Sequence, residues 1–83
     1  MSDAVVAPEG SVVTLDGTRI GIANIFERDY VAAGEQRRGE TAMLHFTDDT
    51  SLVAGAGTVV GSWRVAAVTP GEPRGSVEFE RCA

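Results

Sequence analysis

The sequence contains no lysine, one cysteine and one histidine, and these shortages exclude several classes of function. The single cysteine, Cys82, has no second cysteine with which to form an internal disulfide or a thiolate metal site. The basic residues are seven arginines against twelve acidic residues, which gives a net charge of −5. Such a charge disfavours binding to the phosphate backbone of nucleic acids. We therefore expect no nucleic-acid partner, no metal and no cofactor.

Long apolar runs are also missing. The chain has no stretch of about eighteen apolar residues, so the sequence predicts no membrane-spanning helix. Residues 1–10 carry neither a basic segment nor an apolar run of signal-peptide length, and they contain Pro8 and Gly10. We interpret them as a flexible tail before a single domain over residues 11–83, and we expect the protein to be cytoplasmic.

The motifs of common enzyme classes are absent as well. The sequence has no phosphate-cradling glycine loop, no G-x-S-x-G, no H-E-x-x-H and no calcium-binding loop. This pattern makes nucleotide-dependent, hydrolytic and metal-dependent enzymes poor interpretations and favours a protein without catalytic activity.

Short β-branched runs separated by turn residues fill most of the chain, which is typical of an all-β domain. Asp16-Gly17 and Gly61-Ser62 each have the composition of a two-residue hairpin turn. The glycines in Gly55–Gly57 provide a place where a sheet can turn a corner. The pattern predicts a small barrel or a compact sandwich of six to seven short, mostly antiparallel strands.

The segment "ETAMLHFTDDTS" holds the only histidine. If Asp48 and Asp49 form a two-residue loop, His45 faces Leu52 and lies beside Met43. This register favours a partly buried, structural histidine. A binding or acid–base role for His45 stays open, because its ordinary pKa is near neutrality.

Residues 27–40 form the longest polar stretch. A loop, a one-turn helix after Asp29 and an extension of two long strands all fit it. We favour an extended hairpin with its tip near residues 33–36. Tyr30, Arg37 and Arg38 would then lie close to the tip, and tyrosine and arginine are enriched at interaction hot spots.

Three more residues are candidates for a site. Glu27 and Asp29 lie two positions apart and would share a strand face, where a carboxylate with a raised pKa could act in acid–base chemistry. Trp63 is the largest apolar residue; it belongs to the core or lines a pocket at the mouth of a barrel.

The pattern "VVTLDGTRIGIANI … GTVVGSWRVAAV", from Ser11 to Val68, resembles small uncharacterised β-rich proteins of GC-rich actinobacteria. The resemblance consists of the hairpin spacing, the glycine before the Trp-Arg-Val strand and the composition. It implies a β-rich fold and a cytoplasmic location, and it offers no established active site to carry over to this chain.

These observations favour a non-catalytic module that binds a partner protein, itself or a small apolar ligand. One alternative is an unusually small, metal-free cyclase or isomerase of secondary metabolism, and another is a structural or phage-like assembly protein. Short strands with unguarded edges also favour a homodimer, with Tyr30, Arg37 and Phe79 near its interface.

Overall fold

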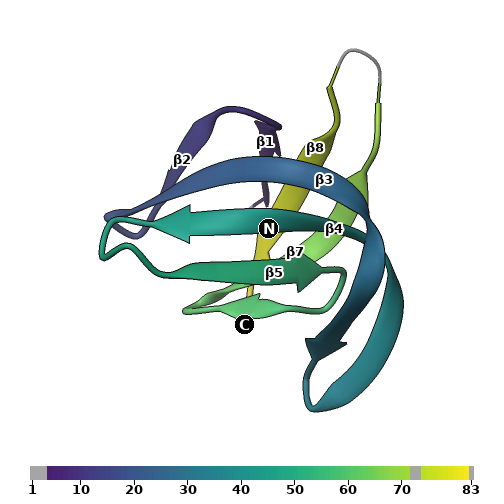
Figure 1. Ribbon diagram of the computed structural model, residues 1–83. Helices are drawn as coiled ribbons and strands as arrows, with labels where there is room; N and C mark the ends of the chain where they lie inside the picture. The colour runs from purple at the N-terminus through teal and green to yellow at the C-terminus, as the bar shows by residue number, and fades with distance from the viewer. Residues whose placement is uncertain (1–3, 72–73, 83) are drawn as a thin grey trace.

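The computed structural model describes residues 4–71 and 74–82, which form eight antiparallel strands (Figure 1). The strands, in chain order, are β1 (Ala4–Pro8), β2 (Val12–Leu15), β3 (Thr18–Ala32), β4 (Glu35–Phe46), β5 (Ser51–Gly55), β6 (Val59–Val60), β7 (Trp63–Thr69) and β8 (Ser76–Arg81). The predicted all-β class is confirmed. The predicted count of six to seven strands is wrong, because there are eight.

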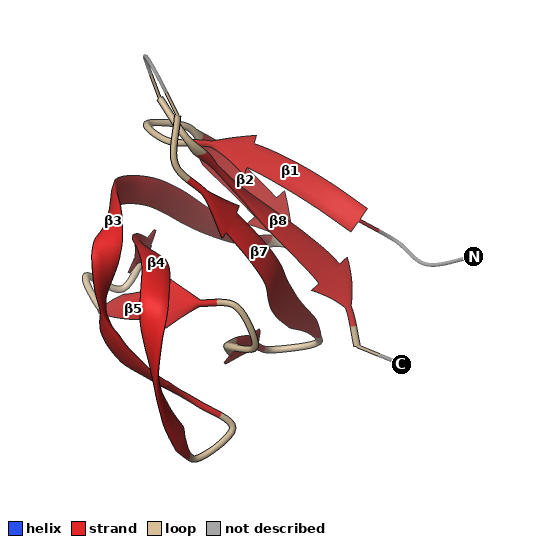
Figure 2. Cartoon of the chain, turned by 90° about the vertical axis from the view of Figure 1, so that its right-hand side faces the viewer, coloured by secondary structure: helices blue, strands red, loops and turns tan. Residues whose placement is uncertain are grey.

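The strands form two antiparallel sheets of four strands each. The sheet with the order β2-β3-β4-β5 lies nearer the viewer in Figure 1 and is called the front sheet; the sheet with the order β1-β8-β7-β6 lies behind it and is called the back sheet. Figure 2 shows the two layers from the side, with the front sheet curled into a half-barrel. The chain passes between the sheets twice, after β1 and after β5.

The second passage explains part of the strand count. Gly57, with a φ of 95°, separates β5 in the front sheet from β6 in the back sheet. Because glycine has no Cβ, it adopts this backbone conformation without the steric cost that other residues meet. The corner predicted at residues 55–57 is therefore confirmed, and it divides one run of the chain into two strands.

The expected tail over residues 1–10 is wrong where the structure describes it. Residues 4–8 form β1, which pairs with β8, and Ala7 is buried. The Glu9 amide continues the pairing by donating a hydrogen bond of 2.8 Å to the Gly75 carbonyl. Pro8 is compatible with this strand because β1 lies at the edge of its sheet, where a missing N–H leaves no gap in a ladder. Residues 1–3 lie outside the described part of the chain.

The core lies between the two sheets and contains side chains from both. Phe79 on β8, with Val65 and Val77, meets Ile22 and Leu44 from the front sheet, and all five are almost completely buried. Strand β8 lies between β1 and β7. Because Phe79 is 0% exposed on an inner strand, the expectation that it lies near a dimer interface is wrong.

Two of the three predicted hairpin registers are confirmed. Leu15 pairs with Thr18 across the Asp16-Gly17 turn, where both turn residues have positive φ. Val60 pairs with Trp63 across the Gly61-Ser62 turn.

The third register is displaced by one residue. Phe46 and Thr50 close a loop of three residues, in which Asp49 adopts a φ of 67°. Three-residue loops of this kind end in a residue of left-handed conformation, which aspartate tolerates better than most residues. His45 consequently faces Ser51, while Leu52 faces Leu44.

The predicted extended hairpin over residues 27–40 is confirmed. A β-bulge after Ala23 turns β3, and Asn24 takes a φ of 54° there. Beyond the bulge, β3 and β4 stay paired as far as Ala32 and Glu35 and are joined by a two-residue turn at Ala33-Gly34. We call residues 26–41 the arm; it extends away from the front sheet at the lower right of Figure 1.

Candidate functional site

The arm does not bring Tyr30, Arg37 and Arg38 together at its tip. Tyr30 and Arg37 are paired on the side that meets the corner after β5, whereas Arg38 lies on the opposite side. The Tyr30 ring is 9% exposed, and its hydroxyl donates a hydrogen bond of 2.9 Å to the Ala56 carbonyl. Tyr30 therefore attaches the arm to the body instead of presenting an aromatic ring to a partner.

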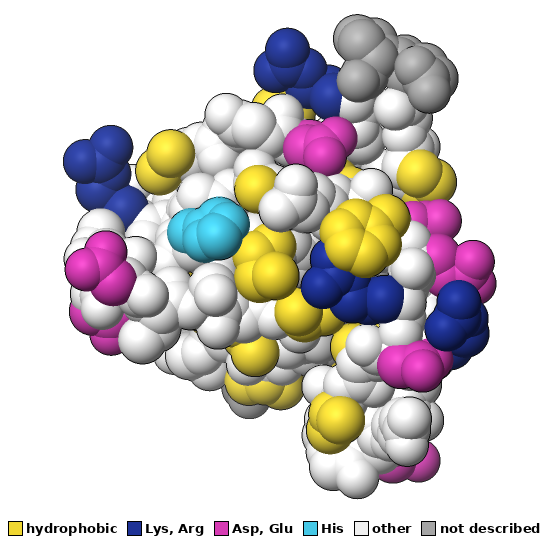
Figure 3. Space-filling model, in the orientation of Figure 1, with side chains coloured by type: hydrophobic (Ala, Val, Ile, Leu, Met, Phe, Trp, Pro, Cys, Tyr) yellow, Lys and Arg dark blue, Asp and Glu magenta, His cyan; other side chains and the backbone are white. Residues whose placement is uncertain are grey.

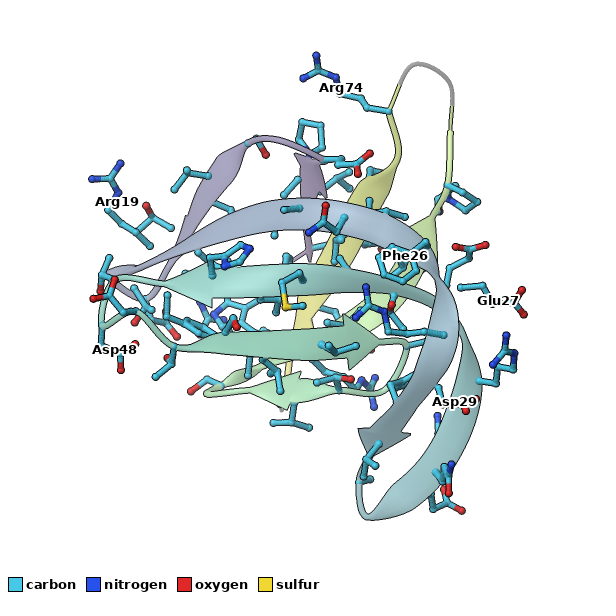
Figure 4. The ribbon with its side chains drawn as sticks, in the orientation of Figure 1. Arg19, Phe26, Glu27, Asp29, Asp48 and Arg74 are labelled. Carbon is cyan, nitrogen blue, oxygen red and sulfur yellow. The ribbon has the colours of Figure 1, made fainter. Side chains whose placement is uncertain are left out.

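The charges of the arm pair with one another. Arg38 contacts Asp29 at 3.1 Å and Glu27 at 3.7 Å. As predicted, the two carboxylates share one strand face, but Figure 4 shows both on the outer side of the arm, and both are exposed. Neither group is in a buried setting that would suit acid–base chemistry.

His45 lies on the outer face of the front sheet and is exposed, which contradicts the expectation of a partly buried histidine. Its neighbours on the adjacent strands are Gly21 and Ser51. Two causes account for the difference: the three-residue loop changes its partner on β5, and no other element of the described chain covers this face of the sheet (Figure 2).

Asp48 belongs to the turn, as predicted, and Thr50 fixes its carboxylate. The Thr50 hydroxyl donates to Asp48 Oδ1 at 2.5 Å and the Thr50 amide donates to the same oxygen at 3.2 Å. These hydrogen bonds, the hydroxyl first, lower the pKa of Asp48 from its ordinary value.

We predict that Thr50→Ala raises the pKa of Asp48 toward its ordinary value, because the hydroxyl donor, the largest cause of the lowered pKa, is lost while the amide donor remains. In the native chain, ionised Asp48 favours the folded state at pH values above its ordinary pKa, and this contribution is lost as the pH falls through the lowered pKa. Carboxyl carbon shifts followed by NMR across the acid range measure the change. Thr47→Ala is the control, and equal pKa values in the native protein and Thr50→Ala would contradict the assignment.

Trp63 lines a cavity of about 300 Å³ at the end of the molecule where the turns after β2 and β6 meet. We call it the mouth pocket. Its lining combines apolar and polar side chains: Leu15, Asp16, Thr18, Ile20, Val60, Ser62 and Trp63, with Gly61 from the second turn. A mostly apolar cavity with a few polar groups is the common form of a small-molecule site, and this one is at the small end of the usual volume range.

A polar contact across the two sheets fixes one wall of the pocket. The indole N–H of Trp63 donates to Asp16 Oδ2 at 3.1 Å, and Arg81 donates to both oxygens of the same carboxylate at 3.3 and 3.4 Å. The Arg81 guanidinium also lies over the indole ring, 4.4 Å from its centroid. Because Asp16 satisfies the buried end of the indole, Trp63 is 5% exposed and held in one orientation.

A second cavity, of about 520 Å³, lies between the arm and strands β6 and β7. Arg37 and Arg64 line it, and hydrogen bonds with Glu35 and Glu80, respectively, raise the guanidinium pKa of each. Since each arginine already has its own carboxylate, the cavity presents no unpaired positive charge to a ligand.

The sequence pointed to Trp63 but missed its partners. Asp16 and Arg81 lie 65 positions apart in the chain, and only the packing of one sheet on the other brings them together. The sequence held one indirect signal for the pocket. Each of the two predicted hairpin turns contains a residue of the lining, Asp16 in one turn and Ser62 in the other.

Among the described residues, no group of three or more histidine, cysteine, aspartate and glutamate side chains is placed to hold a metal ion. A search of the same residues for a helix long and apolar enough to cross a membrane finds none. No protein-family model, curated protein or solved structure matches the chain.

Proposed function

We propose that the chain is a non-catalytic binding module that takes one small, uncharged, largely apolar molecule in the mouth pocket. The observation that carries the proposal is the cavity of about 300 Å³ beside a tryptophan whose orientation is fixed before any ligand arrives. Preorganised walls favour binding because a ligand does not have to order them. We also infer a cytoplasmic location, which rests on the composition of the chain.

The charges at the pocket favour a neutral ligand. Asp16 is the acidic residue of the lining, and its carboxylate already accepts hydrogen bonds from Trp63 and Arg81. Within the described residues, the hydroxyls of Thr18 and Ser62 make no hydrogen bond. A ligand with an apolar body and one carbonyl or hydroxyl group would therefore match the lining.

The same arrangement favours binding over a cyclase or isomerase reaction. Proton transfer requires a group that can change its protonation state against the substrate. Both oxygens of Asp16 already accept hydrogen bonds from the Arg81 guanidinium, and one also accepts from the Trp63 indole, so neither oxygen is free to reach a substrate.

The proposal predicts that cyclohexanone and benzyl alcohol bind in the mouth pocket with dissociation constants on the order of millimolar, as small ligands with few atoms do. Trp63 is the only tryptophan, so its fluorescence reports directly on the pocket. Amide NMR shifts should change around Thr18 and Ser62. Benzoate, which is anionic, should bind at least about tenfold more weakly, because it loses hydration in a largely apolar cavity where Asp16 already occupies the Arg81 guanidinium.

Matched variants separate the pocket from the rest of the surface. Val60→Phe fills the cavity and should weaken binding of both probes at least about tenfold, which is about 1.4 kcal/mol. Val59→Phe is the control, because Val59 is 55% exposed and does not line the mouth pocket. Equal loss in both variants, or shifts that spread over the molecule without centring on the pocket, would overturn the proposed function.

A further inference from the structure

The outer face of the front sheet carries an apolar centre that nothing in the described chain covers. Ala23, Met43 and Val53 form a row across three neighbouring strands, and each is partly exposed. Phe26, which is 48% exposed, lies beyond the row on the arm side. Figure 3 shows that apolar side chains gather on this face, with the single histidine, His45, beside them.

Arg28 extends this surface and carries an uncompensated charge. Its guanidinium lies over the Phe26 ring at 3.6 Å from the centroid, and its Nε atom is buried without a hydrogen-bond partner. Within the described residues Arg28 forms no ion pair, whereas Arg37, Arg38 and Arg64 each contact a carboxylate. A half-buried cation without a carboxylate partner is costly even over an aromatic ring, and a carboxylate supplied from outside the chain would lower that cost.

Carboxylates lie at the opposite end of the same sheet. Figure 4 shows Phe26 at the arm end and Asp48 at the turn between β4 and β5. Thr50 holds the Asp48 carboxylate in place through its Oδ1 atom, which leaves Oδ2 available. Asp49 follows directly in the same exposed turn.

The turn end carries two carboxylates, Asp48 and Asp49, against one exposed arginine, Arg19, so its net charge is negative and complements Arg28 at the arm end. A two-fold axis that lies in the plane of the face, perpendicular to β4, places the Arg28 end of one copy over the Asp48 end of the other, and it does so twice. The row of Ala23, Met43 and Val53 then meets its own copy at the centre. Face-to-face packing of two sheets about 10 Å apart is an ordinary arrangement for β proteins.

We propose that a second copy of this chain occupies the outer face of the front sheet, with Arg28 of each copy paired with the Asp48–Asp49 turn of the other. This interface differs from the one expected from the sequence. Phe79 is fully buried and Tyr30 is 9% exposed, so neither is free to contact a partner. The surface is also separate from the mouth pocket, so the two proposals stand or fall independently.

Sedimentation equilibrium from about 10 to 500 micromolar, a range suited to a modest interface, tests the proposal. The native chain should show the mass of two chains at the upper end, and added salt should weaken the dimer because the end contacts are ionic. A mass of one chain throughout would overturn the proposal.

Charge reversal identifies the surface. Arg28→Glu and the Asp48→Arg/Asp49→Arg variant should each raise the dimer dissociation constant at least tenfold, and combining all three substitutions should restore at least part of the affinity. Arg38→Glu is the control, since Arg38 lies on the opposite side of the arm. If Arg28→Glu does not fold, the turn variant, with two exposed substitutions, still decides. A dimer unaffected by the turn variant would place the interface elsewhere and overturn the assignment.

Discussion

Phe79→Ala is expected to lose about 3–5 kcal/mol of unfolding free energy, the usual cost of truncating a fully buried phenylalanine. Phe79 is 0% exposed and packs between the two sheets on a central strand. At about 0.05–0.15 kcal/mol per residue, the stability of a chain of 83 residues is about 4–12 kcal/mol. The substitution should therefore remove a quarter or more of the stability, and at the lower end of this range it would leave the protein near its unfolding threshold at room temperature.

Phe26→Ala is the matched control for that experiment. Phe26 is 48% exposed and covers the Arg28 guanidinium, so its removal should cost no more than about 1 kcal/mol in the monomer. Urea unfolding followed by Trp63 fluorescence, at a protein concentration too low for self-association, measures both values. If Phe79→Ala were no more destabilising than Phe26→Ala, the position of β8 inside the back sheet would be wrong.

The inward face of β8 could be predicted from the sequence, but its place in the sheet could not. The alternation of Val77 and Phe79 with Glu78 and Glu80 identifies one buried face. Whether a strand is central depends on its partners, and one of these was β1, which Pro8 made resemble a tail. A proline is compatible with an edge strand, so it was a weak reason to exclude one.

Turn chemistry predicted registers well where glycine was present and failed where it was absent. Gly17 and Gly61 mark two-residue turns, and both registers are confirmed. Asp48 and Asp49 suit a loop of two or three residues, and the structure contains the longer one. A difference of one residue changed the partner of His45, although its exposure follows from the uncovered face.

The candidate site illustrates a different limit. Trp63 could be chosen from the sequence because a lone, large aromatic residue is either core or pocket. Its neighbour Arg81 lies opposite it on β8, but the contact of both residues with Asp16 joins elements of different sheets, and no local pattern encodes the packing of one sheet on another. In the arm, the β-bulge at Asn24 changes which side chains face the body. The sequence has no glycine at this position, so no local pattern predicted the bulge.

The arm packs against the body through the contact between Tyr30 and Gly55, and a substitution at Gly55 is expected to cost a large part of the stability. A Cβ added at Gly55 would lie 2.5 Å from Cζ of the Tyr30 ring, closer than real contacts allow. The ring cannot move away at low cost, because it is buried and its hydroxyl is bonded to the Ala56 carbonyl. Gly55→Ala should therefore cost about 1–3 kcal/mol, as overpacking of a filled site does. It should also expose the arm amides to hydrogen exchange, because the arm must separate from the body.

Gly39→Ala is the control for this substitution, because a Cβ at Gly39 would meet the Tyr30 ring at an ordinary 4.0 Å. It should be neutral or slightly stabilising, since alanine restricts the unfolded chain more than glycine does.

Removing the Tyr30 ring should relieve the clash that alanine makes at position 55. Tyr30→Ala alone should cost about 3 kcal/mol, as truncation of a buried aromatic does. Combined with Gly55→Ala, it should cost less than the sum of the two single changes by at least about 1 kcal/mol. Chemical denaturation of the four proteins in this cycle measures the coupling. Additive losses would mean that the glycine is required for another reason and that the arm is not held to the body through Tyr30.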